Sequence, residues 1–186
     1  MAIEIRLAKM GDIQGLMTLE SRYFIGNLGP GERGDGFMSV EHPEGWFAEA
    51  ITLGGIHVAV ADGGEIVGFM AVTPPPAVDK PGLPAVVREM VRLAESVTLG
   101  GKALAKQAYC LHGPVCIDER FRGQGIFSAF EVVTRKAYRG RYQYAVMFVS
   151  VDNPRSLHTV TTKLGARDLV VFTAEGKSYH LLAFEF

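Results

Sequence analysis

Several stretches of the chain carry apolar residues in the patterns of β-strands. In residues 3–7, isoleucine and leucine alternate with polar or small side chains, which predicts a strand with one buried face. Residues 56–73 hold two apolar runs around an Asp-Gly-Gly turn at 62–64, and this turn supplies the positive φ angles that a tight β-hairpin requires. Residues 144–151 are apolar on both faces, as expected of a strand covered on both sides. Further strands are predicted near residues 109–117, 168–173 and 178–185.

Helical spacing, with apolar residues three and four positions apart, appears between these strands. It predicts helices near residues 12–24, 83–97, 124–138 and 154–164. Asp12 opens the first of them, and its carboxylate is expected to accept hydrogen bonds from the N–H groups of the first turn. Residues 26–45 are rich in glycine and contain two prolines, which predicts a mobile loop.

The length and charge of the chain limit its function before any motif is considered. The 186 residues fit a single domain, residues 1–186 with a helical insertion at about 74–108, which can fold without disulfides or metals. The 19 basic and 20 acidic residues nearly cancel, so no global field favours nonspecific binding to nucleic acid or membranes. We expect neither kind of partner, and any recognition of charge is local.

The cysteines and the N-terminus indicate where the protein works. The two cysteines are Cys110 and Cys116, and on one extended strand they lie roughly 20 Å apart, too far for a disulfide. Reduced cysteines are typical of cytoplasmic proteins. The N-terminal residues lack the apolar block of a signal peptide, and no stretch reaches the length of a membrane span. We therefore expect a soluble, cytoplasmic protein.

Residues 116–130, CIDERFRGQGIFSAF, place Arg120, Arg122, Gly123 and Gly125 between a strand and a helix. Three interpretations are open. In the first, the arginines are solvated in a surface loop. In the second, the glycines belong to a dinucleotide-binding turn, although that motif follows its strand directly and begins a larger fold. In the third, the turn cradles a diphosphate. For the third, glycines let backbone N–H groups approach an anion, the helix N-terminus favours negative charge, and the arginines add cations.

The strand before the turn favours a diphosphate. Gly113 and Pro114 interrupt it, and because proline removes a ladder donor and glycine allows a bulge, the strand is expected to kink or splay in its middle. A splayed strand offers backbone N–H and C=O groups to an extended ligand. A diphosphate cradle beside such a strand suits coenzyme A, because its pantetheine arm is peptide-like.

The order of the elements and these motifs resembles the GNAT superfamily of N-acetyltransferases over nearly the whole chain. The matching segments read HGPVCIDERFRGQGIFSAF and AVMFVSVDNPRSLHTVTTKLGA. The most specific element is R-x-x-G-x-G, matched by Arg120, Gly123 and Gly125. The segment Arg122-Gly123-Gln124-Gly125 also fits the R-G-x-G form of the same motif. The resemblance implies an α+β fold of three layers: a central, mostly antiparallel mixed sheet splayed between strands 4 and 5, with helices on both faces.

The resemblance also implies an acetyl-CoA-dependent N-acetyltransferase, in which a primary amine attacks the thioester directly in a ternary complex. The acceptor is a small-molecule or peptide amine, no metal is expected, and pairing of C-terminal edge strands would give a homodimer. The residues implied to contact the coenzyme are Val115, Cys116, Ile117, Arg122, Gly123, Gln124, Gly125, Ile126, Phe127 and Asn153. The N–H of Ile117 would face the thioester carbonyl as a catalytic hydrogen-bond donor.

Direct attack needs a proton acceptor, because an alkylamine with a pKa of about 10.4 is protonated at neutral pH. The candidates are His112, Asp118 and Glu119. His112 precedes the bulge, where related enzymes often place a base, but a structural histidine that bonds a neighbouring carbonyl explains it as well. The two acidic residues are also explained as solvated charges or as ion-pair partners of Arg120 and Arg122.

Many members of the superfamily place a tyrosine in the helix after the asparagine, where it protonates the leaving thiolate. Here that helix reads NPRSLHTVTTKLG, with Val160 or Thr161 at the expected position. A thiol with a pKa of about 8.5 can leave largely unprotonated near neutral pH, so activity is still expected. The alternative is a coenzyme-binding sensor or regulatory module of the same fold with weak or no catalysis. Cys116 has no paired base and is expected to be a small buried residue without a catalytic role.

Two segments exceed the minimal pattern of the family, the loop at 26–45 and the insertion at 74–108. Long segments of this kind are either functional or disordered, and we expect both to form the wall around the acceptor. Aromatic residues would supply its apolar surfaces, with ordinary core packing as the alternative. They are Tyr23, Phe24, Phe37, Trp46 and Phe47.

Overall fold

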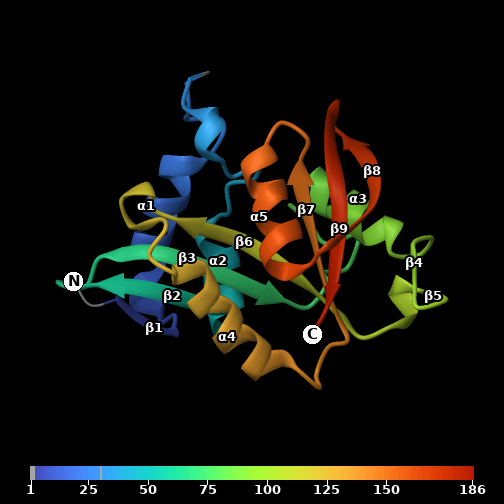
Figure 1. Cartoon of the computed structure of the whole chain (residues 1–186), viewed down its shortest axis with the longest axis horizontal. Helices are drawn as coiled ribbons and strands as arrows, with labels where there is room; N and C mark the ends of the chain where they lie inside the picture. Colours follow the sequence, from blue (N-terminus) through green and yellow to red (C-terminus); the bar gives the residue numbers. More distant parts are fainter. Residues whose placement is uncertain (1–2, 30) are drawn as a thin grey trace. The chain divides into compact units, whose positions relative to one another are not determined.

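We describe the protein from a computed structural model that places residues 3–29 and 31–186 (Figure 1). The helices are α1 (Ile13–Tyr23), α2 (Glu44–Thr52), α3 (Ala85–Leu93), α4 (Ile126–Tyr138) and α5 (Pro154–Leu164). The longer strands are β1 (Ile3–Leu7), β2 (Ile56–Ala61), β3 (Ile66–Thr73), β6 (Tyr109–Ile117), β7 (Tyr144–Ser150), β8 (Arg167–Ala174) and β9 (Lys177–Glu185). Every predicted helix and strand is confirmed, with ends shifted by a few residues.

The chain forms two compact units. The first comprises Met1–Thr73 and His112–Ala137, and the second comprises Pro74–Leu111 and Tyr138–Phe186. Strand β6 contributes its first three residues to the second unit and the others to the first. The expectation of a single domain stays a prediction.

In the first unit, β1, β2 and β3 form an antiparallel ladder, and β6 follows β3 in the order of the sheet. Because successive side chains of a strand point to opposite faces, this sheet has two apolar faces. On one of them Val58 and Phe69 pack in a cluster with α1 and α2. On the other, Ala59 and Met70 pack against Phe130 of α4. In this unit, helices therefore cover both faces of the sheet, as predicted.

In the second unit, β7 and β9 pair in antiparallel register, and β9 also pairs with β8. Helix α5 packs on β7, and α3 packs on β8. After α3, Gly100 and Gly101 form the turn of a small hairpin of β4 (Thr98–Leu99) and β5 (Lys102–Ala103), and both glycines have positive φ.

The pairing of β6 accounts for the predicted interruption of the sheet. The strands follow the order β1-β2-β3-β6-β7-β9-β8, and β6 with β7 is the parallel pair. Their ladder joins Tyr109–Leu111 to residues 144–146 and stops before Gly113, which has a φ of 129°, and Pro114, which has no N–H to donate. The fold is therefore α+β with a mixed, mostly antiparallel sheet whose fourth and fifth long strands share only a short ladder.

Two local features differ from the expectations. The carboxylate of Asp12 does not cap α1; it accepts two hydrogen bonds from Arg6, at 2.7 and 2.9 Å, and one from the backbone N–H of Lys9. Asp12 lies in the short helix Met10–Asp12 before α1, where its carboxylate meets the N–H of Lys9 and the charged guanidinium of Arg6, a strong donor. Helix α2 is not predicted by the sequence pattern, because nine residues carry too few apolar repeats beside a glycine-rich loop.

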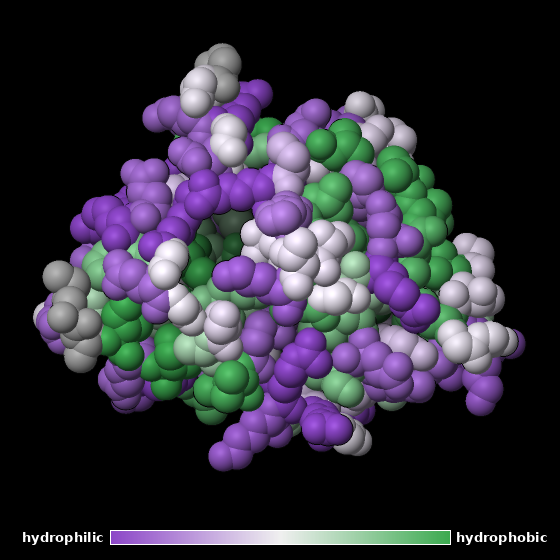
Figure 2. Space-filling model, in the orientation of Figure 1, coloured by the Kyte–Doolittle hydropathy of each residue, from purple (hydrophilic) through white to green (hydrophobic). Residues whose placement is uncertain are grey.

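Polar residues cover most of the visible face of the molecule, and smaller apolar patches lie between them (Figure 2). Within the described residues, every helix is too short or too polar to cross a lipid bilayer.

Candidate functional site

The second half of β6 directs its backbone groups alternately to two sides. The N–H of Asp118 donates to the carbonyl of Val67 at 2.9 Å, and the carbonyl of Cys116 lies beside Gly68, so these two residues face β3. Because backbone groups alternate along a strand, those of Val115 and Ile117 point away from β3. The N–H of Ile117 therefore points away from β3, and its contact with a thioester carbonyl stays a prediction.

The turn after β6 presents a row of backbone N–H groups. Gly123 and Gly125 have φ angles of 78° and 83°, a region that favours glycine, and residues 123–125 are exposed. The first hydrogen bond of α4 joins the N–H of Ala129 to the carbonyl of Gly125 at 2.9 Å. The three preceding N–H groups, at residues 126–128, therefore have no acceptor inside the helix. Together with the helix dipole, this backbone suits a bound diphosphate.

Arg122, which the sequence places beside the diphosphate, makes contacts elsewhere in the first unit. Its Nε donates to the carbonyl of Ile117 at 2.9 Å, and one terminal nitrogen donates to the carbonyl of Asp35 at 2.8 Å. The guanidinium also lies 5.0 Å from the ring centre of Tyr23. The N–H of Arg122 donates to the carbonyl of Glu119 at 3.2 Å. The backbone from Gly123 onward is thus better placed than Arg122 to meet an anion, and a role of Arg122 at the diphosphate stays a prediction.

Asp118 is buried and holds two arginines. It accepts hydrogen bonds from the N–H, Nε and Nη2 of Arg120 at 3.0, 3.0 and 2.9 Å, and it forms an ion pair with Arg22 of α1. Burial acts to raise the pKa of Asp118, but the hydrogen bonds and positive charges of Arg120 and Arg22 outweigh it and hold the pKa below its ordinary value. Such a carboxylate is a weak base, which favours the ion-pair interpretation.

The other two base candidates lie in different surroundings. The side chain of His112 is 1% exposed, and its Nε2 lies 2.9 Å from Oε1 of Glu131 on α4. The geometry therefore favours a structural histidine with a carboxylate partner. Glu119 is exposed, and its backbone N–H donates to the hydroxyl of Tyr23 at 2.8 Å.

Both cysteines are buried. Burial raises the pKa of Cys110 to about 12, and it raises the pKa of Cys116 further. The thiol of Cys116 lies 3.9 Å from the carbonyl of Leu19 in the core beside α1. A thiol that stays protonated is a poor nucleophile, which agrees with the expected lack of a catalytic role.

In the second unit, Asn153 begins α5. Its side-chain oxygen accepts a hydrogen bond from the N–H of Ser156 at 3.1 Å, and Asn153 as a whole is 5% exposed. Val160 is buried, and the hydroxyl of Thr161 donates to the carbonyl of Leu157 at 2.8 Å. Asn153 thus has a structural role as a helix cap, and its contact with a coenzyme stays a prediction.

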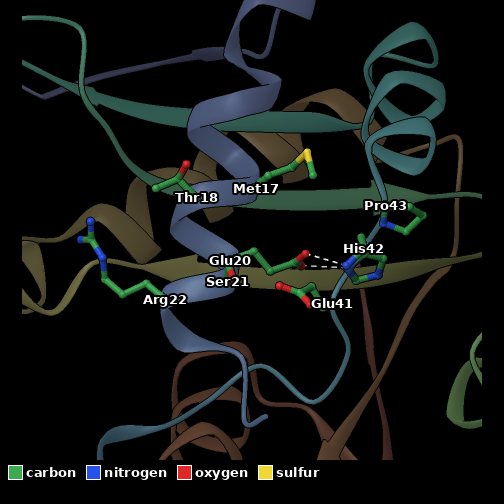
Figure 3. Close-up of a pocket in the computed structure, with 8 residues that line it drawn as sticks. All are labelled: Met17, Thr18, Glu20, Ser21, Arg22, Glu41, His42 and Pro43. Carbon is green, nitrogen blue, oxygen red and sulfur yellow. Dashed lines mark hydrogen bonds and ion pairs between the residues drawn. The ribbon is translucent and has the colours of Figure 1, made fainter. Parts of the chain in front are cut away.

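A cavity of about 880 Å³ lies in the first unit between α1 and the end of the predicted loop (Figure 3). Its lining comes from α1 between Met17 and Arg22 and from residues 41–43. Figure 3 shows Glu20 reaching from α1 to His42, whose backbone N–H and Nδ1 both lie 2.7 Å from its carboxylate oxygens. The loop at 26–45 therefore does contribute to a cavity wall.

The aromatic residues expected in this wall have other positions. None of the five lines the cavity. Phe47 is fully buried in the core, and Tyr23 and Phe37 are each 8% exposed. The ring centre of Trp46 lies 4.0 Å from that of His42, so Trp46 packs against a residue of the cavity wall without lining the cavity.

Sequence reasoning missed Glu20 and His42. A signal for Glu20 was present, because it follows Leu16 by four residues and precedes Tyr23 by three, on the apolar stripe of α1. A carboxylate on such a stripe is buried and needs a partner. The sequence does not point to His42, which lies 22 residues further along in a loop. Within residues 3–29 and 31–186, no group of three or more His, Cys, Asp or Glu side chains has the geometry to hold a metal ion.

Comparison with known proteins supports the fold. No protein-family model matches the chain, and no curated protein matches its sequence. An acetyltransferase of the GNAT family from Streptococcus agalactiae superposes with a TM-score of 0.65 and 14% identity, covering 99% of this chain and 95% of that one. The NatC complex bound to Gag peptide and CoA gives a TM-score of 0.65 and 11% identity, covering 100% and 99%. Arabidopsis thaliana NAA60 in complex with a bisubstrate analogue gives 0.63 and 14%, covering 99% and 98%. The chain therefore has the fold of GNAT acetyltransferases, as the resemblance implied.

Proposed function

We propose that the protein is an acetyl-CoA-dependent N-acetyltransferase that acts on a primary amine. The observation that carries this proposal is the turn at residues 123–127, where positive φ angles and the start of α4 align backbone N–H groups for an anion. Five residues, including the short helix Glu119–Phe121, join this turn to β6, whose last residues direct alternate backbone groups away from β3. A diphosphate and a peptide-like arm joined in one ligand fit the two features together.

In the proposed complex, backbone N–H groups from Gly123 to Phe127 hold the diphosphate. Val115 and Cys116 lie along the pantetheine arm, and Asn153 stays a candidate for a coenzyme contact on the resemblance alone. The N–H of Ile117 donates to the thioester carbonyl, whose oxygen gains negative charge as the amine attacks. His112 and Glu119 stay candidates for the base on the resemblance alone.

Two structural neighbours agree with this assignment. The NatC complex was solved with CoA and a peptide, and NAA60 was solved with a bisubstrate analogue. An analogue that joins both substrates needs one site that holds them at the same time. By analogy, we infer direct attack within a ternary complex, with acetyl-CoA as cosubstrate and a small-molecule or peptide amine as acceptor.

Calorimetry with acetyl-CoA tests the binding half of the proposal. Gly125→Glu adds a carboxylate to the turn and a side chain at a φ of 83°, where the new Cβ would meet no atom within 4 Å. We expect an affinity at least about tenfold weaker, because the negative charge repels the diphosphate. Gly176→Glu is the matched control, because Gly176 has a φ of 74° and equal space in the turn between β8 and β9. Equal weakening by both substitutions, or no binding by the unaltered protein, would refute the cradle.

Free-thiol release from acetyl-CoA over a panel of primary amines tests the transfer half. One observation favours a second candidate, a coenzyme-binding sensor: α5 carries no tyrosine to protonate the leaving thiolate. The sensor predicts binding of acetyl-CoA without thiol release for any amine, whereas the enzyme predicts release that depends on the amine.

A further inference from the structure

The cavity beside α1 holds a histidine whose Nδ1 contacts a buried carboxylate. Glu20 is 1% exposed as a side chain and receives both the backbone N–H and Nδ1 of His42. An ionised carboxylate only accepts hydrogen bonds, so opposite an ionised Glu20 the hydrogen is on Nδ1, and in the neutral ring Nε2 then carries the lone pair. Glu20 thus fixes the tautomer of His42, as a buried carboxylate does in a hydrolase triad.

Nε2 of His42 is the available end of this pair. Across the part of the chain that the structure describes, this nitrogen makes no hydrogen bond. The buried side-chain atoms without a hydrogen-bond partner do not include it, so it is reached by solvent. The ring is held from the other side by Trp46 and Phe47, at 4.0 and 6.2 Å between ring centres. An imidazole with contacts at one nitrogen and one ring face, and with its second nitrogen accessible, therefore lies in the cavity wall.

One residue of the cavity lining, Arg22, also contacts the segment that follows β6. Leu19, on the same helix, contacts the thiol of Cys116, and Arg22, which lines the cavity, pairs with Asp118. These contacts place the second half of α1 across the residues on either side of Ile117. Ile117 is the residue whose N–H would hold the thioester carbonyl in the proposed function.

We propose that this cavity binds the primary ammonium group of the acceptor and that His42 is the catalytic base; the proposal rests on the proposed function. The ammonium group gives one proton to Nε2, and Glu20 stabilises the imidazolium. The nitrogen then attacks the thioester carbon, so that a C–N bond forms and the C–S bond breaks. The second proton lost by the nitrogen goes to the departing thiolate, and the products are an acetamide and the free coenzyme thiol.

The charges around His42 suit a cation. Glu20 and Glu41 both line the cavity, whereas the cation there, Arg22, is paired with Asp118. From α2, the groups against the ring are the aromatic side chains of Trp46 and Phe47. The volume of about 880 Å³ is in the range of small-molecule sites. A small amine and the N-terminus of a peptide share the ammonium group, and the probes below distinguish them.

Kinetics with His42→Gln test the catalytic role. We expect kcat/KM for the amine to fall about a hundredfold, and the rise of rate with pH that reports an imidazole base to disappear. Affinity for acetyl-CoA should stay within about twofold. His158→Gln is the control, because His158 is an exposed histidine on α5. Wild-type kcat/KM and an unchanged pH profile in His42→Gln would overturn the assignment.

A binding measurement keeps the proposal testable if no amine is turned over. The ring signals of histidine-labelled protein are followed by NMR during titration with n-butylamine, with Ala-Ala-Ala, and with its N-acetylated form. We expect the signal that His42→Gln removes to shift with one of the two free amines, which identifies the source, and not with the acetylated peptide. If neither free amine shifts it, the amine site is refuted. If it shifts while acetyl-CoA releases no thiol, the amine site stands and the proposed acetyl transfer fails.

Discussion

Two histidine–glutamate pairs lie in the first unit, one toward α1 and one toward α4, and they differ in which partner is accessible. In the Glu20–His42 pair, the carboxylate is 1% exposed and the histidine 10%. In the His112–Glu131 pair, the histidine is 1% exposed and the glutamate 10%. The distances between partners are similar, at 2.7 and 2.9 Å.

The difference shows that burial of one partner decides what the pair can do. A buried carboxylate orients its histidine and leaves the second ring nitrogen for another molecule. A buried histidine that gives Nε2 to the protein has lost the nitrogen that a substrate would need. His112 has the position expected of a base and the contacts of a structural residue, whereas His42 has the contacts of a base.

Removing His112 should give the largest effect on stability. His112→Leu leaves the carboxylate of Glu131 without its histidine, and Oε2 of that residue keeps only an ion pair with Nε of Arg135 at 3.6 Å, without a hydrogen bond among the described residues. We expect the free energy of unfolding to fall by about 3 kcal/mol in urea denaturation, because one partner of a buried pair remains. His158→Leu on the exposed face of α5 should change it by less than about 0.5 kcal/mol. If folded His112→Leu transferred acetyl groups more than tenfold more slowly, the His112–Glu131 pair would be the catalytic one.

Exchanging the two glutamates for glutamine separates the pairs by activity. Glu20→Gln removes the charge that stabilises the imidazolium of His42, so we expect kcat to fall about tenfold to a hundredfold with little change in acetyl-CoA affinity. Glu131→Gln, the matched substitution in the other pair, should leave kcat within about twofold. Steady-state thiol release measures both. Equal losses of kcat would show that neither pair is special to the reaction.

The sequence predicted those parts of the fold that depend on neighbours along the chain. Alternation and helical spacing located the strands and four of the helices, and Gly113-Pro114 predicted where the ladder of β6 ends. Glycines 123 and 125 predicted the turn, because positive φ angles are a local requirement.

Partners that lie far apart in the chain could not be predicted in the same way. Arg122 contacts Asp35, 87 residues away, and Arg22 pairs with Asp118, 96 residues away. The choice among several carboxylates and carbonyls depends on tertiary packing, which no local pattern encodes. For the same reason Glu20 could have been recognised as buried, but its partner His42 could not.

Asp118 is a third buried carboxylate, and its partners are arginines, which stay charged at every working pH, in place of a histidine. Its pKa is lowered in the folded protein, so its ion pairs contribute stability above the unfolded value of about 3.9 and lose it as pH falls through the folded value. We expect Asp118→Asn to cost about 1–2 kcal/mol at pH 7. The gap between this variant and the unaltered protein should narrow below about pH 4 in urea denaturation. A gap that stays constant down to pH 3 would show that the arginines do not stabilise the ionised form.

Arg122 connects the turn to the segment that leads to His42, and its removal should have the smallest effect on stability. Arg122→Met keeps an unbranched side chain but loses the hydrogen bonds to the carbonyls of Ile117 and Asp35 and the contact with the ring of Tyr23. Because the side chain is partly exposed, we expect a loss of about 1 kcal/mol. Limited proteolysis should cut the loop around the short helix Arg33–Asp35 faster, whereas Lys136→Met, an exposed cation on α4, should leave the rate unchanged. If Arg122 instead binds the diphosphate, the same variant would weaken acetyl-CoA binding by more than tenfold and leave the proteolysis rate unaltered, so one substitution distinguishes a structural arginine from a ligand-binding one.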